Sequence, residues 1–148
     1  MTRRQLRESI FKILFQVEFG EKEEWEEQLA LYTEELASPL LKLPDEESAG
    51  CEVTDLDLAY ITQKVRAIYD RIADLDKIIE DHTEGWNLNR IGKAELAILR
   101  LAVYELRYDE DVPQGVAINE AVELTKIYCA EEAKGFVNAV LAKVTKDA

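Results

Sequence analysis

The side chains that most often carry out chemistry in proteins are scarce in this chain. Its 148 residues include one histidine and two cysteines. Cys51 and Cys129 lie far apart without CxxC spacing, which argues against a disulfide framework and against a zinc site. His82 has no second imidazole and no thiol near it in the sequence. We therefore expect it to pack against a loop or face solvent rather than bind a metal.

The sequence motifs of the common enzyme classes are also absent. The chain has no P-loop, no GxGxxG after a strand, no GxSxG and no HExxH. Its many carboxylates fall on expected helix surfaces, where solvation explains them. With so few candidate nucleophiles, we expect a protein that is not an enzyme and has no cofactor and no metal.

Long uncharged apolar runs are missing as well. The first residues, MTRRQLRE, contain no apolar run before a cleavage site, so the sequence predicts no signal peptide and a cytoplasmic location. The most apolar stretch is interrupted by charges and is too polar to cross a membrane.

Charge is abundant but unevenly distributed. The net charge of −13 disfavours nucleic-acid binding by the surface as a whole. Residues 1–20, however, carry four Lys or Arg against two Glu, whereas residues 21–60 carry two against thirteen acids. A polyanion could therefore bind the basic N-terminal tip while the acidic remainder faces a basic protein.

The most apolar stretch, residues 90–107, organises the predicted fold. Its sequence, RIGKAELAILRLAVYELR, is rich in Ala and Leu and predicts a helix that is apolar on nearly every side. Only Lys93, Arg100 and Arg107 form a narrow basic strip. Such a helix has to be enclosed by other helices.

The remaining periodicity predicts an all-α fold of about seven helices, without strands. Expected helices cover about 5–19, 23–36, 55–72, 74–79, 90–107, 116–128 and 133–143, with Gly20 ending the first, Thr54 or Asp55 capping the third and Asp74 capping the fourth. Residues 38–50, with two prolines and an acidic run, predict a linker. We expect a single domain with subdomains at about 1–50 and 51–148.

The first expected helix has two apolar faces. Leu6, Ile10, Ile13, Leu14 and Val17 form a core stripe, and Phe11, Phe15 and Phe19 point roughly the opposite way. Either the helix is sandwiched between two layers, or part of the phenylalanine stripe is exposed to dock a partner. Arg3, Arg4 and Arg7 stand at its start, where cations oppose the helix dipole, which mildly favours an external role for them. Simple solvation of the three charges is the alternative.

Three segments carry a resemblance to a known family. They are RRQLRESIFKILFQ near the N-terminus, WNLNRIGKAELAILRLAVYEL in the middle, and VPQGVAINEAVELTKIY with GFVNAVL toward the end. Together they resemble the NusB family of bacterial transcription antitermination factors, over most of residues 3–20 and 53–145. The third segment is the longest and most specific.

The resemblance implies two three-helix subdomains plus an extra helix, without catalysis. Family members bind the boxA segment of nascent RNA together with NusE, a basic ribosomal protein of the small subunit. They act in the RNA polymerase antitermination complex on ribosomal RNA operons. By position, the resemblance implies RNA contacts at Arg3, Arg4, Arg7, Tyr128, Glu132, Lys134 and Phe136, and NusE contacts at Phe15, Phe19 and Glu95. From helical spacing alone, Tyr128 and Phe136 could equally be core residues.

The chain also departs from the family pattern. The family's Lys before Phe-Val-Asn is Gly135 here, with Lys134 one position earlier and about 100° around the helix. The family's Gly after Val-Asn is Ala139, and an Ala of Glu-Leu-Ala-Lys is Thr125.

Two other functions remain open from the sequence. The phenylalanine stripe could make a homodimer or a helical protein-binding scaffold without RNA. A NusB-like module that serves an RNA methyltransferase is a third reading, although no cofactor-binding α/β half is present.

Overall fold

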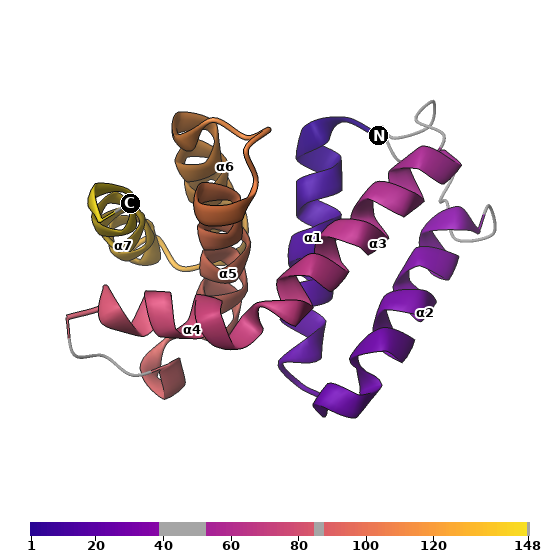
Figure 1. Cartoon of the computed structure of the whole chain (residues 1–148), viewed down its shortest axis with the longest axis horizontal. Coiled ribbons are helices and arrows are strands. Elements are labelled where there is room, and N and C mark those ends of the chain that lie inside the picture. Colours follow the sequence, from indigo (N-terminus) through magenta and orange to yellow (C-terminus); the bar gives the residue numbers. More distant parts are fainter. Residues whose placement is uncertain (39–52, 85–87, 148) are drawn as a thin grey trace. The chain divides into compact units, whose positions relative to one another are not determined.

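The computed structural model describes residues 1–38, 53–84 and 88–147, and regular structure in these ranges is helical throughout (Figure 1). It contains seven α-helices and no strand among the described residues, which confirms the predicted all-α class. The chain forms two compact units, Met1–Ala67 and Ile68–Ala148, which we describe separately. Residues 39–52, which hold most of the predicted linker and the expected subdomain boundary, lie outside the described residues, so that boundary stays a prediction.

Unit 1 contains α1 (Arg3–Val17), a short 3-10 helix (Lys22–Glu24), α2 (Trp25–Ala37) and most of α3 (Asp55–Asp70). Helix α1 begins two residues before its predicted start because Thr2 and Gln5 form a capping box. The Thr2 hydroxyl accepts from the Gln5 backbone N–H at 3.1 Å, and the Gln5 side chain accepts from the Thr2 N–H at 2.8 Å. The helix ends at Val17, three residues before the glycine that was expected to end it.

Helix α3 begins as the sequence predicts. The Thr54 hydroxyl accepts from the Asp57 N–H at 3.1 Å, and the Asp57 carboxylate accepts from the Thr54 N–H at 3.0 Å. The apolar side chains of unit 1 that are buried come from all three of its helices: Ile10, Phe11, Ile13, Leu14, Val17, Leu29, Ile61 and Val65.

Unit 2 contains α4 (Ile72–Asp81), a short 3-10 helix (Leu88–Arg90), α5 (Lys93–Tyr108), α6 (Gln114–Tyr128) and α7 (Ala133–Lys146). The prediction that Asp74 caps α4 is wrong. Arg71 holds the cap position, and Asp74 lies in the first turn, where its negative charge complements the helix dipole without capping it.

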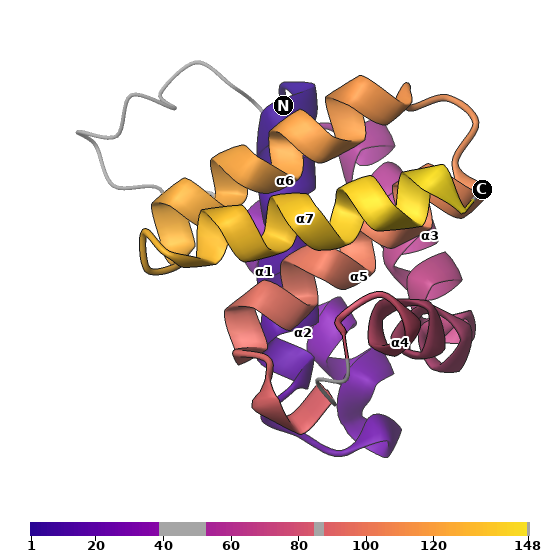
Figure 2. The same cartoon turned by 90° about the vertical axis from the view of Figure 1, so that its left-hand side faces the viewer.

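Helix α5 is the centre of unit 2, as its composition predicts. It packs against α4, α6 and α7, and nine of its residues are buried (Figure 2). Two of the nine are charged, Arg100 and Glu105. The Arg100 guanidinium donates to both carboxylate oxygens of Asp76 on α4, at 2.7 and 2.9 Å. Arg100 is therefore a buried ion-pair residue and not part of an exposed basic strip.

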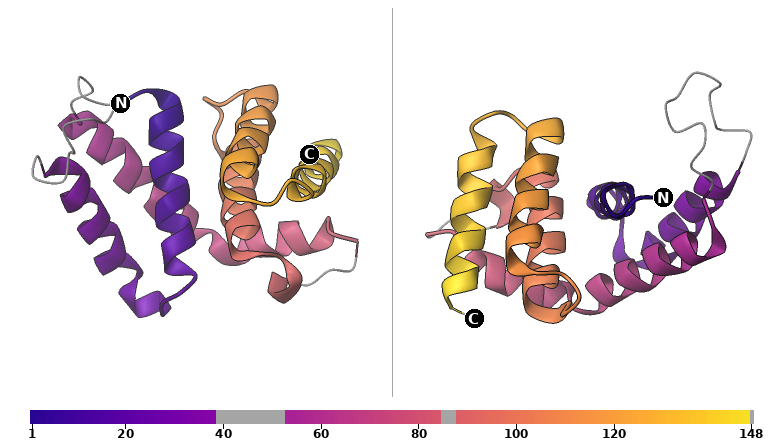
Figure 3. Two further views of the ribbon diagram at one scale, coloured as in Figure 1. Left: turned by 180° about the vertical axis from the view of Figure 1, so that it is seen from behind. Right: turned by 90° about the horizontal axis from the view of Figure 1, so that it is seen from above.

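Helices α6 and α7 run side by side and cover α5 (Figure 3). Helix α6 begins at Gln114, two residues before its predicted start, with Pro113 at its N-cap. The Thr125 hydroxyl is fully buried in α6 but donates to the Ala121 carbonyl at 2.8 Å, so the core contains no unsatisfied hydroxyl there. None of the helices in the described ranges is long and apolar enough to cross a membrane.

Candidate nucleic-acid interface

The first part of the candidate interface is the arginine tip, which consists of Arg3, Arg4 and Arg7 at the start of α1. Arg3 and Arg4 are exposed. The capping box keeps this turn helical even though two cations stand at the positive end of the helix dipole. The tip thus holds a local positive charge in a fixed geometry.

Arg7 differs from the other two arginines because its exposed fraction is only 9%. It lies one helical turn after Arg3, among buried neighbours on α1 such as Ile10. Direct contact of Arg7 with a polyanion stays a prediction, and its burial gives it a structural role as well.

The phenylalanine stripe changes from buried to exposed along α1. Phe11 is 2% exposed, Phe15 is half-buried and Phe19 is 66% exposed. The rings of Phe11 and Phe15 stack with centroids 6.1 Å apart, and those of Phe15 and Phe19 meet edge to face at 5.2 Å. The two readings of the stripe therefore each hold for part of it: one end is core and the other is an exposed aromatic surface.

The second part of the candidate interface surrounds the α6–α7 connection, residues 129–132, in unit 2. Tyr128 ends α6 and is half-buried, and so is Phe136 in the second turn of α7. Glu132 and Lys134, at the start of α7, are exposed. The two aromatic side chains are thus neither core residues nor free surface residues.

Gly135 lies in the first turn of α7, next to Lys134. A Cβ atom built on it would meet no atom within 4 Å, so the surface at this position is open. A larger side chain such as the family's lysine would therefore fit at residue 135 without displacing a neighbour.

Glu95, the third expected partner contact, is half-buried in the first turn of α5 and forms a hydrogen bond with the Cys129 thiol. This contact places the first turn of α5 beside the α6–α7 connection, at one edge of unit 2 in Figure 2. Burial, together with the charge and hydrogen bond of Glu95, raises the pKa of Cys129 to about 12. Cys129 is therefore a protonated thiol at neutral pH and a poor nucleophile.

The position of the Glu95 side chain requires glycine at residue 92. A Cβ atom at Gly92, the N-cap of α5, would lie 2.0 Å from a carboxylate oxygen of Glu95. Glycine at this cap lets the Glu95 carboxylate fold back over the helix start while it reaches Cys129.

The predicted site residues thus fall into two groups. The arginine tip, Phe15 and Phe19 belong to unit 1, whereas Glu95 and the residues around the α6–α7 connection belong to unit 2. Within unit 2 the structure brings Glu95 next to Cys129. Sequence reasoning missed this contact because the two residues are far apart in the chain, and no local pattern marks a hydrogen bond between them.

The described residues contain no set of three or more His, Cys, Asp or Glu side chains that could hold a metal ion. His82 packs against a loop end, with its ring near the Ile78 carbonyl and the Asp147 carboxylate.

Comparison with known proteins identifies relatives along nearly the whole chain. The model of the NusB family matches residues 4–146. The transcription antitermination protein NusB of Agathobacter rectalis is 46% identical over 143 residues, which cover 97% of this chain and 98% of that protein.

Solved structures of similar fold also come from NusB proteins. T. maritima NusB superposes with a TM-score of 0.81 at 31% identity, and the match covers 99% of this chain and 92% of that one. A chain from a crystal structure of the antitermination factors NusB and NusE in complex with double-stranded RNA superposes with a TM-score of 0.77 at 26% identity, over the full length of both chains.

Proposed function

The chain belongs to the NusB family of transcription antitermination factors, and we propose that it binds boxA-type RNA jointly with the ribosomal protein NusE. In this proposal it works in the cytoplasm, within the RNA polymerase antitermination complex on ribosomal RNA operons, and without catalysis. The observation that carries the proposal is the full-length similarity to a chain solved with NusE and RNA.

The arginine tip supplies the electrostatic part of RNA binding. Arg3 and Arg4 are exposed in residues 1–20, which carry four Lys or Arg against two Glu, whereas the whole chain carries a net charge of −13. Guanidinium groups that contact phosphates release counterions, so affinity falls as salt rises. Because most of the surface is acidic, we expect the free chain to bind RNA weakly and NusE to add positive charge.

The residues around the α6–α7 connection supply contacts to bases. Tyr128 and Phe136 each expose part of a ring, which suits stacking on an unpaired base worth about 1–3 kcal/mol. Lys134 and Glu132 are polar neighbours that can contact phosphate, sugar or base edges. Proteins read RNA sequence mostly in single strands, because the deep major groove of duplex RNA excludes side chains.

The exposed end of the phenylalanine stripe supplies the partner surface in unit 1. Phe15 and Phe19 form an edge-to-face pair of which Phe19 is 66% exposed. Aromatic anchors of this kind dominate protein interfaces when a partner covers them. In unit 2, the Glu95 carboxylate would attract a basic partner such as NusE.

The first test measures the salt dependence of RNA affinity. In Arg3→Ala/Arg4→Ala, removal of two phosphate contacts should weaken binding to a boxA-like single strand and flatten the slope of log K against log salt by up to about 1.4. The control, Lys22→Ala/Lys77→Ala, removes the same charge from exposed positions outside residues 1–20 and should keep the slope. An unchanged slope in the arginine variant would show that the arginine tip does not contact RNA. A duplex of the same sequence tests whether single strands are preferred.

The second test separates a partner surface from a core. Phe19→Asp should abolish NusE binding while leaving the circular dichroism spectrum and the unfolding midpoint close to those of the parent, because Phe19 is mostly exposed. Light scattering of the same variant tests the alternative of a homodimer. A parent dimer that Phe19→Asp converts to a monomer, with no RNA or NusE binding by either, would favour the scaffold function.

A further inference from the structure

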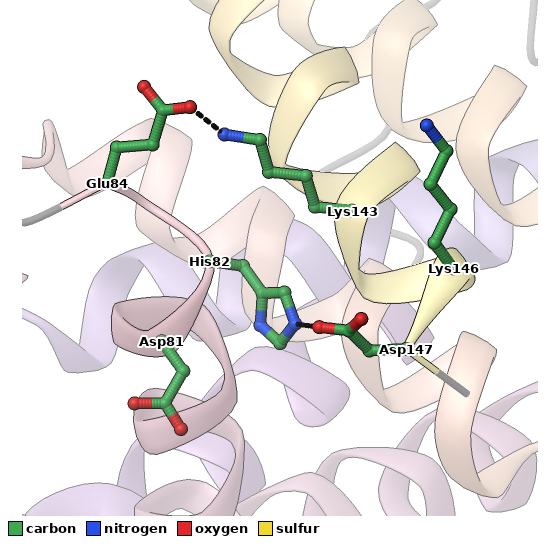
Figure 4. Close-up of a pocket in the computed structure, with 6 residues that line it drawn as sticks. All are labelled: Asp81, His82, Glu84, Lys143, Lys146 and Asp147. Carbon is green, nitrogen blue, oxygen red and sulfur yellow. Dashed lines mark hydrogen bonds and ion pairs between the residues drawn. The ribbon is translucent and has the colours of Figure 1, made fainter.

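A pocket in unit 2 lies at the other end of α7 from Lys134 and Phe136. It is formed by the C-terminal ends of α4 and α7, and helix α7 is about 20 Å long, which separates it from the α6–α7 connection. Its lining is charged or titratable throughout: Asp81, His82, Glu84, Lys143, Lys146 and Asp147 (Figure 4).

His82 joins the two helix ends within this pocket. Its Nδ1 atom lies 2.6 Å from the Ile78 carbonyl oxygen in the last turn of α4. Its Nε2 atom lies 2.6 Å from a carboxylate oxygen of Asp147 at the C-cap of α7. The His82 side chain is only 11% exposed, so water does not compete freely for either nitrogen.

Both partners of the ring can only accept hydrogen bonds. A backbone carbonyl has no proton to donate, and a carboxylate, which is what Asp147 presents in its ion pair with His82, can only accept. A neutral imidazole carries one N–H and would leave a lone pair facing one of these oxygens. We propose that His82 is held in its doubly protonated, positively charged form and acts as a pH-dependent latch between the ends of α4 and α7.

The surrounding charges favour the cation. The C-terminal ends of both helices carry negative partial charge, and a positive group there is stabilising. Asp147 on α7 and Asp81 and Glu84 at the end of α4 add full negative charges. Of the two cations that line the pocket, Lys143 pairs with Glu84, and the Lys146 side chain points away from the ring in Figure 4.

Loss of one ring proton to water would open the latch. The deprotonated nitrogen would then face an oxygen lone pair, so either the Ile78 contact or the Asp147 contact has to break. Asp147 would be left as an unpaired anion at a helix C-terminus, where a negative charge is unfavourable. The C-terminal turn of α7 should therefore loosen as the pH rises.

Nitrogen NMR of the full-length protein tests the protonation state directly. Because His82 is the only histidine, the spectrum contains one pair of ring nitrogens. At about pH 7, near the midpoint of free imidazole, a larger fraction of rings should carry both protons in the parent than in Asp147→Asn. An equal fraction in the two proteins, or a ring nitrogen without a proton at about pH 6, would overturn the proposal.

Hydrogen exchange tests the mechanical consequence. At about pH 6, amides in the last turn of α7 should exchange about threefold to tenfold faster in Asp147→Asn than in the parent. At about pH 9 this difference should vanish or reverse, because only the parent then carries an unpaired anion at the helix C-terminus. The control, Glu84→Gln, breaks the neighbouring pair with Lys143 and should change exchange by the same factor at both pH values. If the Asp147→Asn ratio is also the same at both pH values, the latch does not depend on histidine charge and the proposal fails.

Discussion

Helices α1 and α5 are similar in length and both carry long apolar stretches, but they bury them differently. Helix α5 lies among α4, α6 and α7 and buries nine residues, including Arg100 and Glu105. In α1 the phenylalanine stripe begins with a buried Phe11, and it ends with Phe19, which lies two residues after the helix and is 66% exposed.

The difference shows what hydrophobicity alone conveys. An apolar stretch predicts a helix whose apolar face is buried. It does not tell whether the protein's own helices or another molecule bury that face. In α5 burial is continuous from Leu96 to Val103, and the buried Arg100 is paired with Asp76. In α1 burial ends at Val17, and the exposed Phe19 follows the helix that also carries the arginine tip.

The largest expected effect comes from the two ends of the phenylalanine stripe. Phe11→Ala removes a buried ring and should lower the free energy of unfolding by about 3–5 kcal/mol. Phe19→Ala should change it by less than about 0.5 kcal/mol, because the ring is already mostly in water. Urea denaturation of both variants provides the measurement. Equal losses would mean that α1 is core along its whole length.

The next effect compares two ion pairs of the same geometry. Asp76→Ala leaves the Arg100 guanidinium buried without its two-point partner and should cost about 2–4 kcal/mol of unfolding free energy. Glu26→Ala breaks the two-point pair with Arg66, whose two side chains are both exposed, and should cost much less unfolding free energy. Equal losses of unfolding free energy in the two variants, measured by thermal or urea unfolding, would show that burial does not strengthen the Arg100–Asp76 ion pair.

The contact at the start of α5 can be followed through the reactivity of Cys129. Its raised pKa means that the thiolate is rare at neutral pH, so alkylation in a Cys51→Ser background should be roughly tenfold to a hundredfold slower than in the urea-unfolded chain. The rate should keep rising with pH above 9, whereas the unfolded thiol, with an ordinary pKa of 9.0, levels off near that value.

Glu95→Gln removes the neighbouring charge and should speed the reaction of Cys129. A folded-state rate that levels off near pH 9, or one that does not respond to Glu95→Gln, would show that the contact between α5 and the α6–α7 connection does not form.

The smallest expected effect concerns the open position in α7. Gly135→Lys should raise the free energy of unfolding by up to about 1 kcal/mol through helix propensity, and should strengthen RNA binding about twofold to fivefold through one added charge. Gly115→Lys is the matched control, because its position in α6 is equally open. It should gain stability but leave RNA affinity nearly unchanged. Equal gains in affinity from both lysines would mean that RNA responds only to net charge.

Local features of the fold were predictable from the sequence. Helical spacing of apolar residues gave the all-α class and the central position of α5, and the Thr54 cap was recognisable because its partner Asp57 is three residues away. The start of α1 was placed too late because the capping box of Thr2 and Gln5 was missed, although the two residues are only three positions apart.

Contacts between distant residues were not predictable. The pairs of Arg100 with Asp76 and of His82 with Asp147 join helices that approach one another only after folding. Periodicity assigns a side chain to a helix face, but it does not say which residue of another helix stands opposite. For the same reason, periodicity did not predict how much of the phenylalanine stripe is buried. That depends on which residues of other segments pack against it.

The most direct test of the central claim is the dissociation constant for a boxA-like RNA measured with and without saturating NusE. If the acidic chain depends on its partner for positive charge, NusE should strengthen RNA binding at least about tenfold, or about 1.4 kcal/mol. Phe19→Asp should remove that gain while keeping the weak binding of the free chain. A dissociation constant that is the same with and without NusE would contradict the account.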